Sequence, residues 1–209
     1  MDIKRIDSYT DERFSRTALL QHGAYLVDGE PYELEITAHD RAVIRGKDPS
    51  VYPALIEEFR FHAPQVSLFY DEEGGLLAEY PRAELVTVAL RDIQPSQFYV
   101  DEDKLAAVGS FIKSAEDVIV QVIPWENGFI SLDGHTRAYL AVQRGWKAVK
   151  AVVSETDDWV WVFVNEARKR GVLSPADMKL VSHAEYKVLW DNFCDEVFKS
   201  GSQMQDKEE

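Results

Sequence analysis

The sequence has a single cysteine, Cys194, which excludes an intrachain disulfide and favours a reducing compartment. Positive charge is also scarce, because 23 Lys and Arg stand against 37 Asp and Glu and give a formal net charge of -14. Broad, sequence-independent DNA binding needs a cationic face, so this charge argues against it. No apolar run approaches the length of a membrane span, and residues 1–16 lack the apolar core of a signal peptide. We therefore expect a cytoplasmic protein with no membrane partner.

The residues that are present suit an α+β fold in three regions. Hydrophobic residues make up 45% of the 209 residues, enough for one large core or two smaller ones. Residues 1–84 contain 9 Lys and Arg and 17 Asp and Glu. Residues 85–154 contain 7 and 8 of these, and residues 155–209 contain 7 and 12. A segment that handles a polyanion should carry few excess carboxylates, so the nearly neutral charge of the middle region supports a phosphate site there.

Residues 1–84 are predicted to form an α+β region rich in hairpins. Asp28-Gly29 lies between two alternating apolar segments and is a strong signal for a two-residue hairpin turn. A helix is predicted from about Val51 to Phe61, followed by a second hairpin around Glu73 to Gly75.

Residues 85–154 alternate strands with helices, and residues 155–209 are predicted to be helical. Ser182 and Glu185, three residues apart, form a capping-box signature before the last helix. Apolar periodicity predicts strands at 85–90, 118–123, 129–132 and 147–153, and helices at 101–112, 133–144, 157–169 and 182–199.

The segment Leu132-Asp133-Gly134-His135-Thr136-Arg137 is predicted to be a strand-to-helix turn that holds a phosphate group. Gly134 has no Cβ, so a ligand can approach the backbone closely. The free N–H groups of the first helical turn point into one small volume, and the helix dipole adds partial positive charge there. Thr136 can add a hydroxyl donor, and Arg137 a planar fork that fits phosphate oxygens.

Two residues of this turn are candidate catalytic residues. His135 can donate to a phosphate or move a proton near neutral pH. Asp133 can hold a divalent ion such as Mg²⁺ that is bound to phosphates, or it can cap the helix. The alternative for the whole segment is a capped helix start with solvated first-turn residues, and the spacing alone does not separate the two interpretations.

The order of elements over residues 86–153 resembles the ParB/sulfiredoxin (ParB-like nuclease domain) superfamily. The similarity begins with RDIQPSQ at Arg91 to Gln97, like that family's I-x-P-S, and continues through KLAAVGSFI at Lys104 to Ile112. It includes the hairpin ENGFISLDGHTR at Glu126 to Arg137. The DGHTR motif is a variant of the Asp-Gly-His-His-Arg signature of several members and stands where ParB proteins have Gly-Glu-Arg-Arg.

The resemblance implies a nucleoside di- or triphosphate with Mg²⁺ as cofactor and a small molecule or a protein as substrate. It implies phosphate or nucleotide contacts from Gly134, His135, Thr136, Arg137, Ser96 and Gln97. Sulfiredoxin chemistry needs a cysteine in the turn, and this turn has none. The helix-turn-helix module that follows this domain in ParB partition proteins has no counterpart in residues 155–209.

The same resemblance leaves the general base open. The catalytic acid of the family's free-serine kinase aligns near Gln97, and glutamine cannot accept a proton as a base. Asp133, Glu102 and Asp101 are the alternatives.

We therefore predict a nucleotide-binding protein, either an NTP-dependent phosphotransferase or a nucleotide hydrolase. A non-catalytic regulatory or partner-binding module is the first alternative. A nuclease or DNA accessory factor is the second, and the negative charge argues against it. None of the five histidines makes a metal-ligand pair at helix or hairpin spacing, so no zinc site is expected.

Overall fold

The computed structural model describes the backbone of residues 1–156 and 158–205 and the side chains up to Lys199. Of the predicted C-terminal region 155–209, positions 157 and 206–209 lie outside this description. The chain divides into two compact units, Met1–Leu85 and Val86–Glu209, and the prediction of an α+β protein is confirmed because each unit combines helices with strands. Among the described residues, none of the helices is both long and apolar enough to cross a bilayer.

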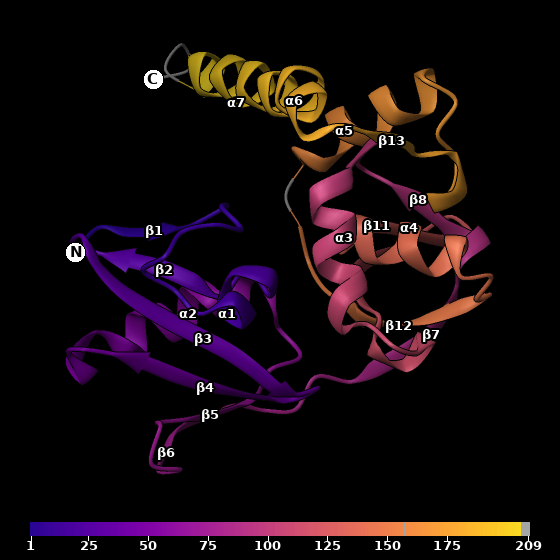
Figure 1. The fold of residues 1–209 in the computed structure, drawn as a ribbon. Coiled ribbons are helices and arrows are strands. Elements are labelled where there is room, and N and C mark those ends of the chain that lie inside the picture. The colour runs from indigo at the N-terminus through magenta and orange to yellow at the C-terminus, as the bar shows by residue number, and fades with distance from the viewer. Residues whose placement is uncertain (157, 206–209) are drawn as a thin grey trace. The chain divides into compact units, whose positions relative to one another are not determined.

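The unit Met1–Leu85 is built on a six-stranded sheet in the order β1-β2-β3-β4-β5-β6 (Figure 1). All neighbouring strands are antiparallel except β4 and β5, which are parallel and are joined through the helix α2 (Tyr52–His62). The other elements are β1 (Ile3–Arg5), α1 (Arg16–Leu20), β2 (Ala24–Val27), β3 (Glu30–Ala38), β4 (Arg41–Gly46), β5 (Leu68–Tyr70) and β6 (Leu76–Glu79).

The predicted hairpin at Asp28-Gly29 is confirmed. Val27 of β2 pairs with Glu30 of β3, which leaves a two-residue loop. Asp28 and Gly29 have φ angles of 49° and 87°, the left-handed pair that matches the twist of the flanking strands. The predicted helix is also present, shifted by one residue to Tyr52–His62. Its apolar side chains pack on the sheet in one buried cluster that includes Leu34, Ile44, Leu55, Ile56, Phe59 and Phe69.

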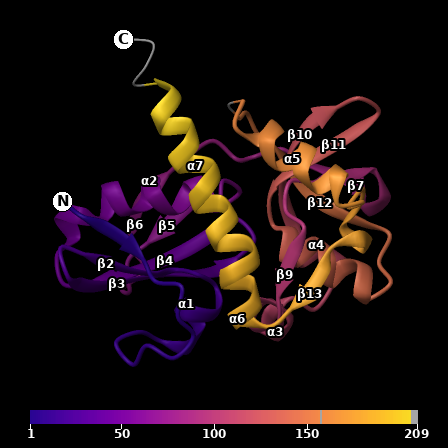
Figure 2. The same ribbon diagram turned by 90° about the horizontal axis from the view of Figure 1, so that it is seen from above.

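The unit Val86–Glu209 is built on a five-stranded sheet in the order β7-β12-β10-β11-β8. Figure 2 labels β7, β10, β11 and β12 of this sheet. Strands β10 and β11 form an antiparallel hairpin, and β12 and β8 join its two sides in parallel. The elements are β7 (Leu85–Ala89), β8 (Ile93–Pro95), β9 (Tyr99–Asp101), α3 (Glu102–Phe111), β10 (Ile119–Trp125), β11 (Gly128–Asp133), α4 (His135–Gln143) and β12 (Ala148–Val153).

Alternating side chains on the central hairpin supply two separate apolar clusters. Val120 and Val122 of β10 belong to the cluster that α3 and α4 complete, through residues such as Val108 and Ala138. The alternate positions of the hairpin, among them Ile130, belong to the cluster formed with α5 (Val160–Lys169). Because successive strand residues point to opposite faces, α4 and α5 cover opposite faces of this sheet.

The C-terminal segment contains a strand that the sequence did not predict. After α5, the strand β13 (Lys179–Val181) pairs in parallel with β9. The predicted capping box at Ser182 and Glu185 is confirmed and starts α6 (His183–Tyr186). A π-helical turn at Lys187–Asp191 then leads into α7 (Asn192–Gln205).

Candidate functional site

The predicted strand-to-helix turn is present at the end of β11. The strand runs to Asp133, one residue further than expected, and α4 begins at His135. Gly134 joins them with φ 84° and ψ 19°, in the left-handed region that disfavours a side chain. A Cβ on Gly134 would also lie 2.9 Å from Val120 Cγ1 and 3.1 Å from Val120 Cα. Backbone conformation and close packing therefore both require glycine here.

The N-cap of α4 is Gly134, which has no side chain to offer the helix. The interpretation of Asp133 as the N-cap residue is therefore wrong, because Asp133 is the last residue of β11. The helix has no side-chain hydrogen bond from its N-cap, so the N–H groups of its first turn keep the partial positive charge predicted for them. Thr136, half-buried, is the second residue of this helix.

Arg137 lies against the turn and is paired within it. Its Nη2 donates to Asp133 Oδ2 at 3.0 Å, an i,i+4 ion pair. The same Nη2 lies 3.2 Å from the position that a Cβ on Gly134 would occupy. The Arg137 side chain is 21% exposed and that of Asp133 is 47% exposed, so both charges are accessible to a ligand.

His135 is buried behind the turn. Its Nε2 lies 3.1 Å from both Ser96 Oγ and the carbonyl oxygen of Ser131, and Ser96 Oγ donates to that carbonyl at 2.8 Å. Burial lowers the pKa of His135 to about 4, against smaller raising effects from Asp133 and the Ser131 carbonyl. The imidazole is therefore neutral near pH 7, and it ties the loop after β8 to the start of α4.

The loop after β8 contributes Ser96 to this arrangement, but the side chains of Ser96 and Gln97 face inward. Ser96 and Gln97 are only 4% and 9% exposed. Gln97 donates from Nε2 to the carbonyl oxygen of Tyr99, and Ser96 is held by Ser131 and His135. The structure thus brings Ser96 to the predicted turn, whereas the hydrogen bond of Gln97 is made within its own loop.

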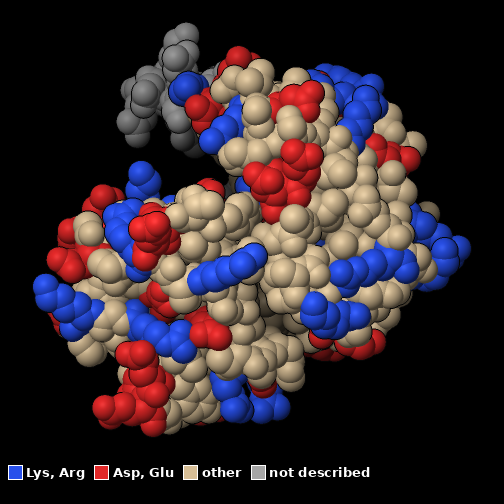
Figure 3. All heavy atoms as spheres, viewed as in Figure 1, with Lys and Arg blue, Asp and Glu red and all other residues tan. Residues whose placement is uncertain are grey.

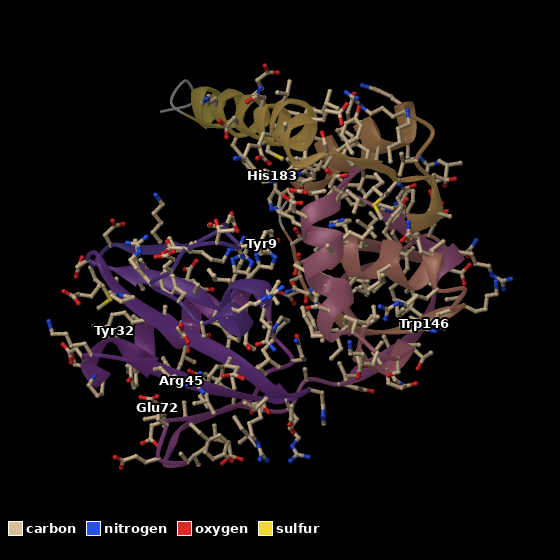
Figure 4. All side chains as sticks on the ribbon, in the orientation of Figure 1. Tyr9, Tyr32, Arg45, Glu72, Trp146 and His183 are labelled. Carbon is tan, nitrogen blue, oxygen red and sulfur yellow. The ribbon has the colours of Figure 1, made fainter. Side chains whose placement is uncertain are left out.

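A second cluster of ionisable side chains lies at the start of α3, and sequence reasoning missed it. Single ligand atoms of Asp101, Asp103 and His183 lie within 4.8 Å of one another. Asp101 caps α3 by accepting the N–H of Asp103 at Oδ1, 2.8 Å away, and its Oδ2 lies 2.7 Å from His183 Nδ1. His183 is the first residue of α6 (Figure 4). It is 82 positions from Asp101, so no local spacing could have indicated the contact.

Charge on the viewed surface is mixed. On the face in Figure 3, Lys and Arg side chains are interspersed with Asp and Glu side chains among uncharged residues. Within the described residues of that face, no continuous basic area comparable to a nucleic-acid groove is present.

Comparison with known proteins adds no family assignment. No family model matches the chain, and no curated protein matches it. Among solved structures, protein Atu1540 from Agrobacterium tumefaciens is similar over 46% of this chain and 61% of its own length. The sequence identity is 14% and the TM-score is 0.33, too low to support an argument about fold or function. This chain thus spans less than two thirds of that structure.

Proposed function

We propose that the turn from Asp133 to Arg137 binds the phosphates of a nucleoside di- or triphosphate together with Mg²⁺, as the resemblance of residues 86–153 to the ParB/sulfiredoxin superfamily implies. The observation that carries the proposal is the start of α4. Its N-cap is a left-handed glycine without a side chain, and the guanidinium of Arg137 lies beside it. Helix N–H groups and an arginine fork at one point form an anion site.

The ion pair of Asp133 and Arg137 suggests how such a ligand binds. In the free protein the two side chains neutralise each other at 3.0 Å. A phosphate with its Mg²⁺ brings an anion for Arg137 and a cation for Asp133, so the ligand replaces both partners at once. A metal-free nucleotide satisfies only Arg137 and leaves the Asp133 carboxylate beside the phosphate, where like charges repel. Binding is therefore expected to depend on Mg²⁺.

A phosphotransferase or hydrolase that acts at this turn needs a general base. His135 is neutral, buried and hydrogen-bonded through Nε2, and the Gln97 side chain cannot accept a proton as a base. Asp133 is the carboxylate at the turn itself. These observations favour a nucleotide-binding regulatory module as the second candidate beside the phosphotransferase or nucleotide hydrolase. The substrate of the enzymatic form is a small molecule or a protein.

The test is nucleotide binding by calorimetry, with ATP, CTP and ADP, each with and without Mg²⁺. Arg137→Ala should lower the affinity for the Mg²⁺ complex at least tenfold, because it removes the fork that faces the phosphate. Arg91→Ala is the matched control, since Arg91 is an exposed arginine beside an acidic residue in the same unit. Asp133→Asn should reduce the Mg²⁺ dependence and strengthen metal-free binding by releasing Arg137.

If none of these nucleotides binds, or Arg137→Ala binds as well as the native chain, the phosphate site is misplaced. Where binding is found, turnover with and without free amino acids separates the enzyme from the regulatory module.

A further inference from the structure

We propose that Asp101, Asp103 and His183 form a second, independent site that binds one divalent transition-metal ion of the Zn²⁺ or Mn²⁺ class. The three residues come from two segments that are distant in sequence, the start of α3 and the start of α6. One oxygen or nitrogen atom from each lies within 4.8 Å of the others. This inference does not rest on the phosphate site, which uses other residues and a different kind of ion.

The burial of Asp101 is the first argument. Its carboxylate side chain is 0% exposed. A buried carboxylate needs a positive partner or several donors. Among the described residues, Asp101 has one backbone N–H, from Asp103, and one imidazole, from His183. A divalent ion at this point would lie beside the carboxylates of both Asp101 and Asp103 and would supply them with positive charge.

The geometry is the second argument. Bonds of about 2.1 Å from one ion to two adjacent ligands place those ligand atoms roughly 3.0–3.4 Å apart. Asp101 Oδ2 and His183 Nδ1, at 2.7 Å, need to separate by only a few tenths of an ångström. Asp103 is exposed, so its carboxylate can turn toward the ion at small cost. The Asp101 carboxylate is held in place through Oδ1, as metal-binding carboxylates commonly are.

The donor set selects the kind of metal. One imidazole nitrogen with two carboxylate oxygens suits Zn²⁺ or Mn²⁺, whereas Ca²⁺ and Mg²⁺ prefer oxygen ligands alone. His183 is 37% exposed, so water can complete the coordination. Because His183 follows β13 and Asp101 ends β9, the ion would fasten the C-terminal segment to the strand with which it pairs.

The experiment uses the untagged full chain, stripped with a chelator and titrated with Zn²⁺ and Mn²⁺ against a chromophoric competitor. We expect one equivalent to bind, and the Co²⁺ form to show the absorption of a nitrogen- and oxygen-ligated ion. Asp103→Asn and His183→Gln should each lower the affinity at least tenfold. Asp103→Asn keeps the backbone N–H that donates to the capping carboxylate of Asp101, so tryptophan fluorescence should show an unchanged fold. Glu102→Gln, an equal change of charge at the neighbouring exposed residue, should bind as the native chain does.

Three results would overturn the proposal. These are the absence of binding, equal affinity in the native chain and Asp103→Asn, and an equal response to Mg²⁺ and Zn²⁺. The last would mean that carboxylates alone hold the ion. None of them bears on nucleotide binding at Arg137, so the two proposals fail separately.

Discussion

Two helices of the unit Val86–Glu209 begin beside an aspartate and a histidine, but the two sites balance their charges differently. At α4, Asp133 pairs with Arg137 four residues along the same segment, while His135 is buried as a neutral ring among uncharged partners. At α3, the carboxylate of Asp101 is fully buried, and its imidazole partner comes from 82 positions away. The exposed, local pair can exchange its partners for a ligand. The buried, long-range pair is better suited to hold the chain together.

The largest effect expected from this comparison is the change in the free energy of unfolding with pH. The pKa of His135 is lowered to about 4 in the folded chain, below its value of about 6.5 in the unfolded chain. The unfolded state therefore takes up the proton first, and stability falls as pH drops from 6.5 to 4 and is flat with respect to this group above 6.5. The full effect is roughly 3 kcal/mol. Urea unfolding between pH 4 and 8 measures it.

The matched variants for the pH test are His135→Asn and His39→Asn. The first should remove most of the slope between pH 6.5 and 4, while the second, at an exposed histidine of the other unit, should retain it. A slope that persists in His135→Asn would mean that other groups control the acid sensitivity.

The next effect concerns Gly134. Gly134→Ala should destabilise the unit by about 2 kcal/mol or more, because the added Cβ meets Val120 in addition to the left-handed strain. Gly145→Ala, at the other end of α4, should cost about 1 kcal/mol, since its φ is 73° and nothing lies within 4 Å of the added atom. Tryptophan fluorescence in urea is the measurement, because all five tryptophans lie in this unit. Equal losses in the two variants would show that packing at Val120 adds nothing.

The smallest expected effect on stability distinguishes Ser96 from Ser131, two serines that lie close together in space. Ser96→Ala should cost about 1 kcal/mol, since its hydroxyl bonds to both Ser131 O and His135. Ser131→Ala should be neutral or slightly stabilising, because its buried hydroxyl has no hydrogen-bond partner within the described chain. The same fluorescence assay compares them, and a larger loss in Ser131→Ala would indicate a partner for that hydroxyl, such as a bound water.

The sequence predicted what local rules determine. The Asp28-Gly29 turn, the start of α4 at a glycine and the capping box at Ser182 each depend on residues within a few positions of one another. It could not predict the short strand β13, whose three residues carry too little pattern. The contact of Asp101 with His183 depends on the tertiary fold alone. The sequence also could not predict that His135 is buried, because the apolar periodicity of α4 does not show which residues cover the first residue of the helix.

The pairing of β9 with β13 has a further consequence for how the chain folds. Tyr99 faces Lys179 across this ladder, so three residue pairs close a loop of about 80 residues. The entropy of closing a loop grows slowly with its length, at about 0.6 kcal/mol per doubling, so insertions inside it should be tolerated. Contacts so distant in sequence form slowly. The C-terminal segment should therefore dock late, and its docking should mark the moment when the unit becomes resistant to proteases.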